Sequence, residues 1–496
     1  MIDSFNADKP YDRFVMEQVA GDELDPGSHE CLIAAGFHRL GPVRRNAGNQ
    51  DVASSRNEVL TDRTDIIGSA FLGMTMGCAR CHNHKFDPIL QKDYYRLQAF
   101  MAATEQHDVS LATPEAQAAW RARHDPIQQK IKDLKKRLRE AKEEERRAIL
   151  EEIERLEDEL PPPLSGINTV RNADEPTKIH VLRRGEFDKK GDAVGMRFPT
   201  VLVSDDLDEL PLSTPNPRTG LARWLTDPRH PMTARVIVNR LWHHHFGRGL
   251  VRTPNDFGLN GDRPSHPELL DFLATALVEG GWRLKPLHRA ILLSSVYRQS
   301  FATPQGVLAR AKDPENRWLW HFERRRLSAE EIRDSMLAVS GRLNLKMGGE
   351  SVFVPVDPEL VSALYKPAQW AVTKDKEEQV RRSIYLVAKR NLRLPSMEVF
   401  DQPTLNSSCG RRETSTHAPQ ALELLNGLTS NPLAEAFAGR LAREEESARV
   451  DLAYRLATGR LPTQKETALA IEFLKTQPLK EFALALFNLN AFLYVD

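Results

Sequence analysis

The chain has 496 residues with 69 basic and 69 acidic side chains, so its formal net charge is zero. Apolar residues make up 41% and charged residues 28%, as is ordinary for a globular protein. The charge balance excludes a whole-molecule attraction to nucleic acid or to an anionic membrane. No apolar run has the length of a membrane-spanning helix, and the first residues lack the basic-then-apolar pattern of a signal peptide. We therefore expect no nucleic-acid partner, no membrane span and no signal peptide in this chain.

Residues 1–105 have the apolar periodicity of helices and form the first predicted domain. We expect one helix over residues 8–21, a second over 58–76 that Gly77 ends, and a third over 91–103. The cysteine-containing stretch GCARCHNHKFDP, residues 77–88, would then lie between two helices.

Residues 115–163 are dense in charge, with apolar residues at three- and four-residue spacing. The apolar positions before and after residues 143–147 are out of step with each other. This pattern predicts a coiled-coil-like arm, either one long helix with a stutter or a helical hairpin, which the prolines at 161–163 end. We interpret it as a protruding, solvated arm; the alternative is a dedicated partner-binding coiled coil.

Residues 164–210 form a predicted small β region, because KIHVLRRG (178–185) and FPTVLVS (198–204) alternate like strands. Residues 211–496 form a predicted helical C-terminal domain. Capping boxes at SHPE (265–268), SAEE (328–331) and TQKE (463–466) mark helix starts there, and RRSIYLVAKR (381–390) indicates one strand. The predicted fold is mainly α and multi-domain, with a small β insert and a protruding charged helical arm.

Cys78, Cys81 and His82 form a C-x-x-C-H motif, and the chain has only four cysteines. Covalent haem c requires this arrangement, since two thiols add to the porphyrin vinyl groups and the adjacent imidazole binds the iron. His84 cannot be the second axial ligand, because the porphyrin plane would stand between it and His82. The other candidates for that position are Met74, Met76, Met101 and His107.

A metal site without haem is the alternative at the same motif. Cys78 and Cys81 would form a zinc knuckle with His82 or His84 as the third ligand. The fourth ligand would be Asp87, Cys31 or Cys409, so the predicted metal-ligating residues outside the thiol pair are His82, His84 and Asp87. A redox dithiol is less expected because a helix precedes the motif, and a purely structural role for the cysteines stays open.

Two polar groups stand out in the C-terminal half. Three consecutive histidines, His243–His245, point three ways from one helix, which favours a structural role; a functional site would join His244 or His245 to Asp256 and His266, as in a metal-dependent hydrolase. Several arginines flank the segment 381–390 and the loop around Cys409, and guanidinium groups suit the carboxylates or sulfates of a polyanion. Ion pairs with nearby acidic residues explain the same arginines: Arg381, Arg382, Arg390, Arg393, Arg411 and Arg412.

Several long segments carry a family resemblance. LGMTMGCARCHNHKFDPILQKDYYRLQAF (72–100) resembles the signature of planctomycete-type cytochrome-associated proteins, in which a cysteine-motif domain of unknown function (1549) precedes a second one (1553). Two later segments, RHPMTARVIVNRLWHHHFGRGL (229–250) and RRRLSAEEIRDSMLAVSGRL (324–343), resemble the second domain of this family. Relative to the family pattern, we expect the signal peptide and the upstream cytochrome domain to be absent from this chain, and its first domain to be incomplete at its N-terminus.

The resemblance implies an exported-type haem- or metal-binding protein, periplasmic or extracellular. It implies electron transfer with a redox partner protein, or an accessory role in extracellular polysaccharide metabolism with acidic polysaccharide as a partner. The alternative function is a non-redox binding protein with a structural zinc at the C-x-x-C-H motif and an arginine-rich surface for a polyanion or partner. Whether the chain is an enzyme stays open.

Overall fold

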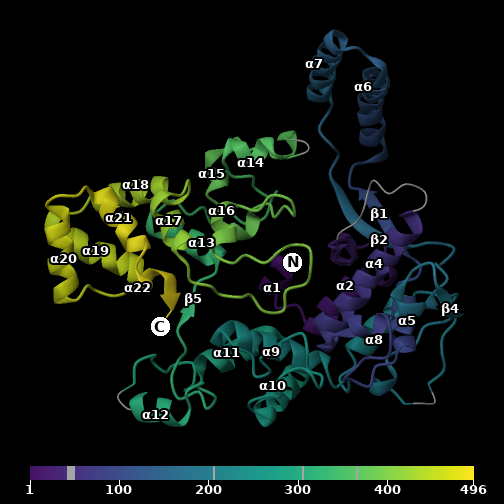
Figure 1. The fold of residues 1–496 in the computed structure, drawn as a ribbon, viewed down its shortest axis with the longest axis horizontal. Coiled ribbons are helices and arrows are strands. Elements are labelled where there is room, and N and C mark those ends of the chain that lie inside the picture. The colour runs from purple at the N-terminus through teal and green to yellow at the C-terminus, as the bar shows by residue number, and fades with distance from the viewer. Residues whose placement is uncertain (42–50, 205–206, 304–305, 365–366, 496) are drawn as a thin grey trace. The chain divides into compact units, whose positions relative to one another are not determined.

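The computed structural model describes residues 1–41, 51–204, 207–303, 306–364 and 367–495. In these ranges the chain is mainly helical, with twenty-two α-helices and six short strands that pair only two by two (Figure 1). This confirms the predicted mainly α fold with a small β insert and a charged helical arm. The chain divides into two compact units: unit 1 is residues 1–234 with 277–284, and unit 2 is residues 235–276 with 285–496.

Unit 1 has a core in which α2, α3 and α8 pack with the β1–β2 ribbon. The helix predicted at 8–21 is α2, and its Val15 and Val19 are fully buried. The elements of unit 1 are α1 Ile2–Asn6, α2 Tyr11–Leu24, α3 His29–Ala35, α4 Asp51–Ile67, α5 Gln91–Ala99, β1 Thr104–Ser110, α6 Pro114–Glu140, α7 Glu143–Glu159, β2 Gly166–Asn172, β3 His180–Leu182, β4 Lys190–Ala193 and α8 Pro217–Leu225.

The helix predicted to end at Gly77 ends earlier. α4 runs from Asp51 to Ile67 and continues as one wider π-helical turn over Gly68–Leu72. Gly73 then adopts the left-handed conformation at φ 60°, and its backbone N–H caps the Gly68 carbonyl. A glycine tolerates this conformation without a Cβ clash, so Gly73 rather than Gly77 is the stop.

The charged arm is a helical hairpin, which decides between the two predicted alternatives. α6 and α7 are separated by Ala141 and Lys142, whose ψ values of 146° and 164° are extended rather than helical. The apolar residues of the two helices bury one another: Ile131, Leu134, Ile149, Ile153 and Leu156. The hairpin is inserted between β1 and β2, which pair antiparallel from Thr104 with Asn172 to Ser110 with Gly166 (Figure 1). The sequence did not predict β1.

One of the two predicted strands of the β region is wrong. The segment 178–185 contains β3, which pairs with β4. The segment 198–204 instead forms a 3-10 turn at Thr200–Leu202, where Pro199 precedes the turn and Phe198 stacks on Trp224 at 4.5 Å. Side-chain packing of Phe198 thus replaces strand pairing there.

Unit 2 buries a large apolar core between α13, α16 and the last helices, with Phe437, Leu441 and Phe487 at its centre. The capping boxes predicted at Ser328 and Thr463 are both present, since each side chain accepts from the N–H three residues later. Three helices, α9, α10 and α11, each include a few residues that are assigned to unit 1. The elements of unit 2 are α9 Thr233–Phe246, α10 Pro267–Glu279, α11 Leu284–Leu293, α12 Gly306–Lys312, β5 Arg325–Arg326, α13 Ala329–Val339, α14 Pro358–Ser362, α15 Lys376–Gln379, α16 Pro395–Val399, α17 Ala418–Asn426, α18 Ser430–Leu441, α19 Glu446–Thr458, α20 Gln464–Leu474, α21 Leu479–Phe487, α22 Asn490–Leu493 and β6 Tyr494–Val495.

The strand predicted at 381–390 is also wrong. Its residues 383–385 form a 3-10 turn, and pairing is limited to single bridges such as Val352 with Leu386. Arg381 is buried, and its guanidinium lies over the Tyr385 ring at 3.6 Å while donating to the carbonyls of residues 346, 348 and 350. An arginine committed to backbone carbonyls organises this segment as loops.

Candidate functional site

The C-x-x-C-H motif lies in a turn of unit 1 between α4 and α5. Cys78 belongs to a 3-10 turn over Met76–Arg80, and Cys81 follows it directly. Both cysteines are exposed and neither is in a disulfide. The two thiols that the sequence predicts as attachment points are therefore free at the surface.

The backbone between the two cysteines is held from α5 and β3. The Arg80 carbonyl accepts from the Tyr95 hydroxyl at 2.8 Å and from the Gln91 amide at 3.0 Å. The same Gln91 amide donates to the Leu182 carbonyl at 2.9 Å, and the Arg80 guanidinium donates to the Gly185 carbonyl at 3.2 Å. Two donors on one carbonyl fix the orientation of the turn, so the motif is preorganised rather than a loose loop.

His82 is exposed, and its ring orientation identifies the nitrogen that can bind a metal. Its Nδ1 lies 2.6 Å from the Asn83 carbonyl oxygen. A carbonyl only accepts, so Nδ1 carries the proton and Nε2 keeps the lone pair in the neutral ring. Metal-binding histidines commonly donate their second N–H in this way, which orients the ring and fixes the tautomer.

His84 and Asp87 lie together but are used within the turn. Both side chains are buried, and His84 Nδ1 accepts from the Asp87 N–H at 2.8 Å with the Asp87 carboxylate 3.3 Å away. Among the residues that the structure describes, no three His, Cys, Asp or Glu side chains are placed to hold one metal ion. The predicted ligand set of His82, His84 and Asp87 is therefore not assembled, and neither is a zinc site joining His84 to the two thiols.

The candidates for a second axial ligand differ in burial but none is placed against His82 by a contact. Met76 and Met101 are buried core residues. His107 lies on β1 opposite Thr169 and is partly buried. None of these residues, Met74 included, is identified by its position as the partner of His82.

A buried carboxyl beneath the turn was not predicted. Asp65 on α4 lies close enough to Gly77 that a Cβ there would be 3.5 Å from its Oδ2. Burial raises the pKa of Asp65 to about 6, with the hydrogen bond from Tyr94 and the charge of Arg80 opposing the rise. Burial and Asp65 raise the pKa of Tyr94 well above its ordinary value. The only sequence feature that could have indicated this carboxyl is an aspartate on the inward-facing side of a predicted helix.

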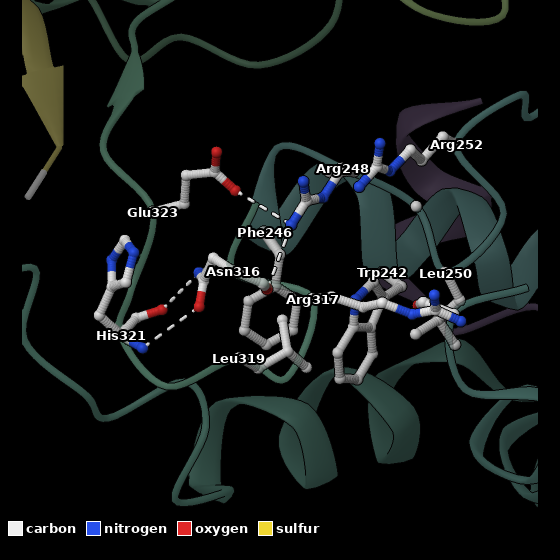
Figure 2. Close-up of a pocket in the computed structure, with 12 residues that line it drawn as sticks. Trp242, Phe246, Arg248, Leu250, Arg252, Asn316, Arg317, Leu319, His321 and Glu323 are labelled. Carbon is white, nitrogen blue, oxygen red and sulfur yellow. Dashed lines mark hydrogen bonds and ion pairs between the residues drawn. The ribbon is translucent and has the colours of Figure 1, made fainter. Parts of the chain in front are cut away.

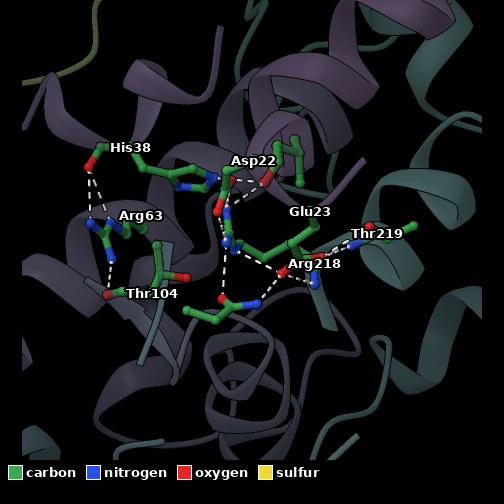
Figure 3. Close-up of polar contacts among 9 residues, drawn as sticks. Asp22, Glu23, His38, Arg63, Thr104, Arg218 and Thr219 are labelled. Carbon is green, nitrogen blue, oxygen red and sulfur yellow. Dashed lines mark hydrogen bonds and ion pairs between the residues drawn. The ribbon is translucent and has the colours of Figure 1, made fainter. Parts of the chain in front are cut away.

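Unit 1 also contains a buried polar network around Arg218 of α8 (Figure 3). Arg218 makes a two-pronged ion pair with Asp22 of α2, and Glu23 accepts from the Thr219 N–H at 2.7 Å and hydroxyl at 2.9 Å. His38 donates from Nε2 to a carbonyl of α2, and burial together with Arg218 and Arg63 holds its pKa well below the ordinary value. Arg218 pairs with both Asp22 and Glu23, and Arg63 donates to backbone carbonyls, so we interpret this network as structural.

The histidines of α9 do not form the predicted site with Asp256 and His266. His245 Nε2 instead lies 2.8 Å from His288 Nδ1 on α11, and burial lowers the pKa of His245. Burial lowers the pKa of His243 to about 4. His266 contacts Ser265 and Trp318, and the Asp256 carboxylate accepts from a backbone N–H in its own loop.

The predicted arginine-rich surface is largely divided among ion pairs and backbone contacts. Arg393 pairs with Glu398, Arg412 with Glu330 at 2.6 Å, and Arg390 donates to the Leu405 carbonyl. Asp401, an acidic residue near these arginines in the sequence, pairs with Arg326.

Two family models match the chain. The model described as "Protein of unknown function (DUF1549)" matches residues 1–106, and the model described as "Protein of unknown function (DUF1553)" matches residues 217–474. The domains follow in the order that the sequence resemblance predicts. No curated protein and no solved structure matches the chain. In the described ranges no helix combines the length and apolar character needed to cross a membrane.

Proposed function

Because the chain belongs to the family described as protein of unknown function (DUF1553), with the DUF1549 match preceding it, we propose its function from the site itself. In this proposal Cys78 and Cys81 would hold haem c covalently, His82 would bind its iron, and the group would supply electron transfer outside the cytoplasm. One observation carries the proposal: the His82 Nδ1–H is committed to the Asn83 carbonyl, which leaves Nε2 as the metal-binding nitrogen beside two exposed thiols.

The attachment chemistry needs only what this motif provides. Each cysteine S–H would add across one vinyl C=C of the porphyrin, with the C–S bond formed to one carbon and the hydrogen transferred to the other, without net oxidation or reduction. Both thiols are free and solvent-accessible, as the addition requires. When bound, haem supplies a one-electron couple between ferric and ferrous iron.

The residues around the motif would orient the group rather than react with it. The shared hydrogen bonds of Tyr95 and Gln91 to the Arg80 carbonyl keep the Cys78-to-Cys81 backbone in one conformation. The Asn83 carbonyl keeps the imidazole from rotating. An exposed site of this kind suits electron exchange with a redox partner protein. A periplasmic or extracellular location, and an accessory role in polysaccharide metabolism, are part of the same proposal.

The test is maturation of the full chain behind a signal peptide in a host with haem-attachment machinery. We expect a pyridine haemochrome spectrum of c type and haem that stays on the polypeptide in a denaturing gel. Cys78→Ser and Cys81→Ser should each lose one thioether bond, His82→Ala should lose the axial ligand, and Cys409→Ser, at an exposed cysteine of unit 2, should behave as wild type. Colourless protein, or one zinc per chain without haem, would overturn the proposal.

A further inference from the structure

A small pocket of unit 2 has the composition of a recognition site. It lies between the end of α9 with the loop after it, residues 247–252, and the loop 313–323 (Figure 2). Its apolar lining comes from Trp242, Phe246 and Leu319, and Arg248, Arg252 and Arg317 surround it. The cavity volume of about 20 Å³ accommodates one or two water-sized groups. The oxygens of a carboxylate or a sulfate have that size, whereas the rest of a larger ligand would have to remain outside the pocket.

Both loops of the pocket are held rigidly. The buried Asn239 side chain accepts from the Val251 N–H at 2.8 Å and donates to the Val251 carbonyl at 3.0 Å, which fixes the first loop on α9. Asn316 accepts from the Trp320 N–H at 2.9 Å and donates to the His321 carbonyl at 2.9 Å, which closes the second loop on itself. A pocket with fixed walls binds without paying an ordering cost first.

The second loop is also strained where it lines the pocket. Asn316 and Leu319 have φ of 51° and 54°, in the left-handed region. Asparagine tolerates this conformation, but for a bulky residue such as leucine it is an outlier that costs free energy. The loop therefore holds Leu319 in the pocket wall at the expense of local stability, and such strain is found preferentially at binding sites.

The charges at the pocket leave one arginine uncompensated. Arg248 donates to the Glu315 carbonyl at 2.7 Å and lies 3.5 Å from the Glu323 carboxylate, and Arg252 pairs with the Glu315 carboxylate at 2.5 Å. The Arg317 guanidinium makes no hydrogen bond or ion pair with any residue in the described part of the chain. A guanidinium without a partner at a pocket is a donor for a carboxylate or sulfate ligand.

Next to Arg317 stands an exposed aromatic ring. Trp318 is 69% exposed, and its contact with His266, edge to face at 5.7 Å, places it near Ser265 in the pocket wall. An indole ring is large and apolar, so its exposed face is available for a second ring to stack on. Tryptophan and arginine are also the residues most enriched where proteins recognise ligands and partners.

We propose that this pocket binds a carboxylate or sulfate group carried by a ring-shaped small molecule. The oxyanion occupies the pocket and accepts hydrogen bonds from Arg317, and the ring packs on Trp318. Two kinds of molecule share this chemistry, a sugar acid and an aromatic acid. The site is separate in sequence and in structural unit from the haem-attachment motif, and its occupancy does not depend on haem.

The test uses ligand-observed NMR and tryptophan fluorescence on the full chain, with sodium glucuronate and sodium benzoate as ring-bearing anions. Glucose and benzyl alcohol are their neutral counterparts, and inorganic sulfate is the anion without a ring. We expect one of the two ring-bearing anions to bind at least about tenfold more tightly than its neutral counterpart, because a charge-assisted hydrogen bond contributes on that scale. Glucuronate binding identifies the sugar-acid source and benzoate binding the aromatic one.

Three variants locate the binding. Arg317→Ala should weaken the binding of the ring-bearing anion and of sulfate alike, by about tenfold. Trp318→Ala should weaken the binding of the ring-bearing anion only. Arg310→Ala, at an exposed position of α12, should change the affinity for neither. Arg317 and Trp318 are exposed, so both variants should keep the wild-type melting temperature. The proposal is overturned if neither anion binds better than its neutral counterpart, or if binding survives Arg317→Ala unchanged.

Discussion

Arg218 and Asp22 join α8 to α2 by two parallel hydrogen bonds, each 2.7 Å long, and no part of the arginine side chain is exposed. The two residues are almost two hundred positions apart in the chain. Their pair therefore links the cysteine-motif domain to the segment that starts the second family match.

Removing one partner of this pair should destabilise unit 1 strongly. Asp22→Ala would leave the Arg218 charge buried beside Glu23 alone, which typically costs about 3–5 kcal/mol. The matched control is Asp227→Ala, since Asp227 pairs with the exposed Arg229 and such surface pairs contribute at most about 1 kcal/mol. Urea unfolding and hydrogen exchange of peptides from α2 and α8 measure both. A loss for Asp22→Ala no larger than that of the control would contradict the structural role of the network.

Replacing Gly185 should destabilise the protein for two reasons, its backbone conformation and its close approach to Cys81. A second glycine, Gly281, allows the two effects to be measured separately. The Gly185 φ of 71° disfavours any other residue, and a Cβ there would lie 2.8 Å from Cys81 Sγ. Gly281 has a φ of 69° but nothing within 4 Å of its Cβ position, so Gly281→Ala measures the conformational cost alone, about 1 kcal/mol. We expect Gly185→Ala to cost more and to slow alkylation of Cys81 by iodoacetamide, with Cys78 unaffected. Equal stability losses and an unchanged Cys81 rate would show that the close approach has no effect.

Asp65 should make unit 1 less stable as the pH rises. Its pKa is raised from 3.8 to about 6, so the folded state holds a proton that the unfolded state releases. The stability contributed by the protonated form is full below pH 4 and is lost as the pH rises through 6, about 3 kcal/mol in all. Asp65→Asn should remove this loss, so the unfolding free energy of the variant should rise relative to that of the wild type between pH 4 and pH 7.

The measurement for Asp65 is the difference in unfolding free energy between variant and wild type at each pH, because His38 titrates in an overlapping range with the opposite sign. Asp227→Asn is the control, since Arg229 lowers the pKa of Asp227 to about 2 and its effect falls below this window. A variant-minus-wild-type difference that is flat from pH 4 to 7 would contradict the buried, raised-pKa state of Asp65.

How far the sequence predicts the fold depends on whether a feature is local. The capping boxes at Ser328 and Thr463 were predicted because their hydrogen bonds span three residues. The strands expected at 198–204 and 381–390 were wrong because an apolar run does not specify a pairing partner. Phe198 stacks on Trp224, and Arg381 lies over Tyr385, and these contacts are invisible to local periodicity.

The same distinction applies to the candidate site. The sequence names Cys78, Cys81 and His82 because their spacing matches a known chemistry. It could not tell that His82 points Nδ1 at a carbonyl or that His84 is turned inward to Asp87, since a dipeptide spacing does not fix ring orientation. The pocket beside Arg317 was not predicted because its two walls are joined by contacts such as that of Arg248 with the Glu315 carbonyl, 67 residues apart in the chain.

The arm offers a test of how independent a domain insertion is. Its apolar residues bury one another, and it leaves the ribbon where Ser110 pairs with Gly166 and the Leu111 N–H donates to the Ser165 carbonyl at 2.9 Å. Replacing residues 112–164 by Asn-Gly should close β1 and β2 as a two-residue hairpin. We expect circular dichroism to lose the helical signal of the arm, while the thermal midpoint and the hydrogen exchange of β1 and β2 stay at wild-type values. A milder variant, Ile153→Asp, should unfold the arm alone; a fall in ribbon protection in either variant would mean that the arm stabilises the core it grows from.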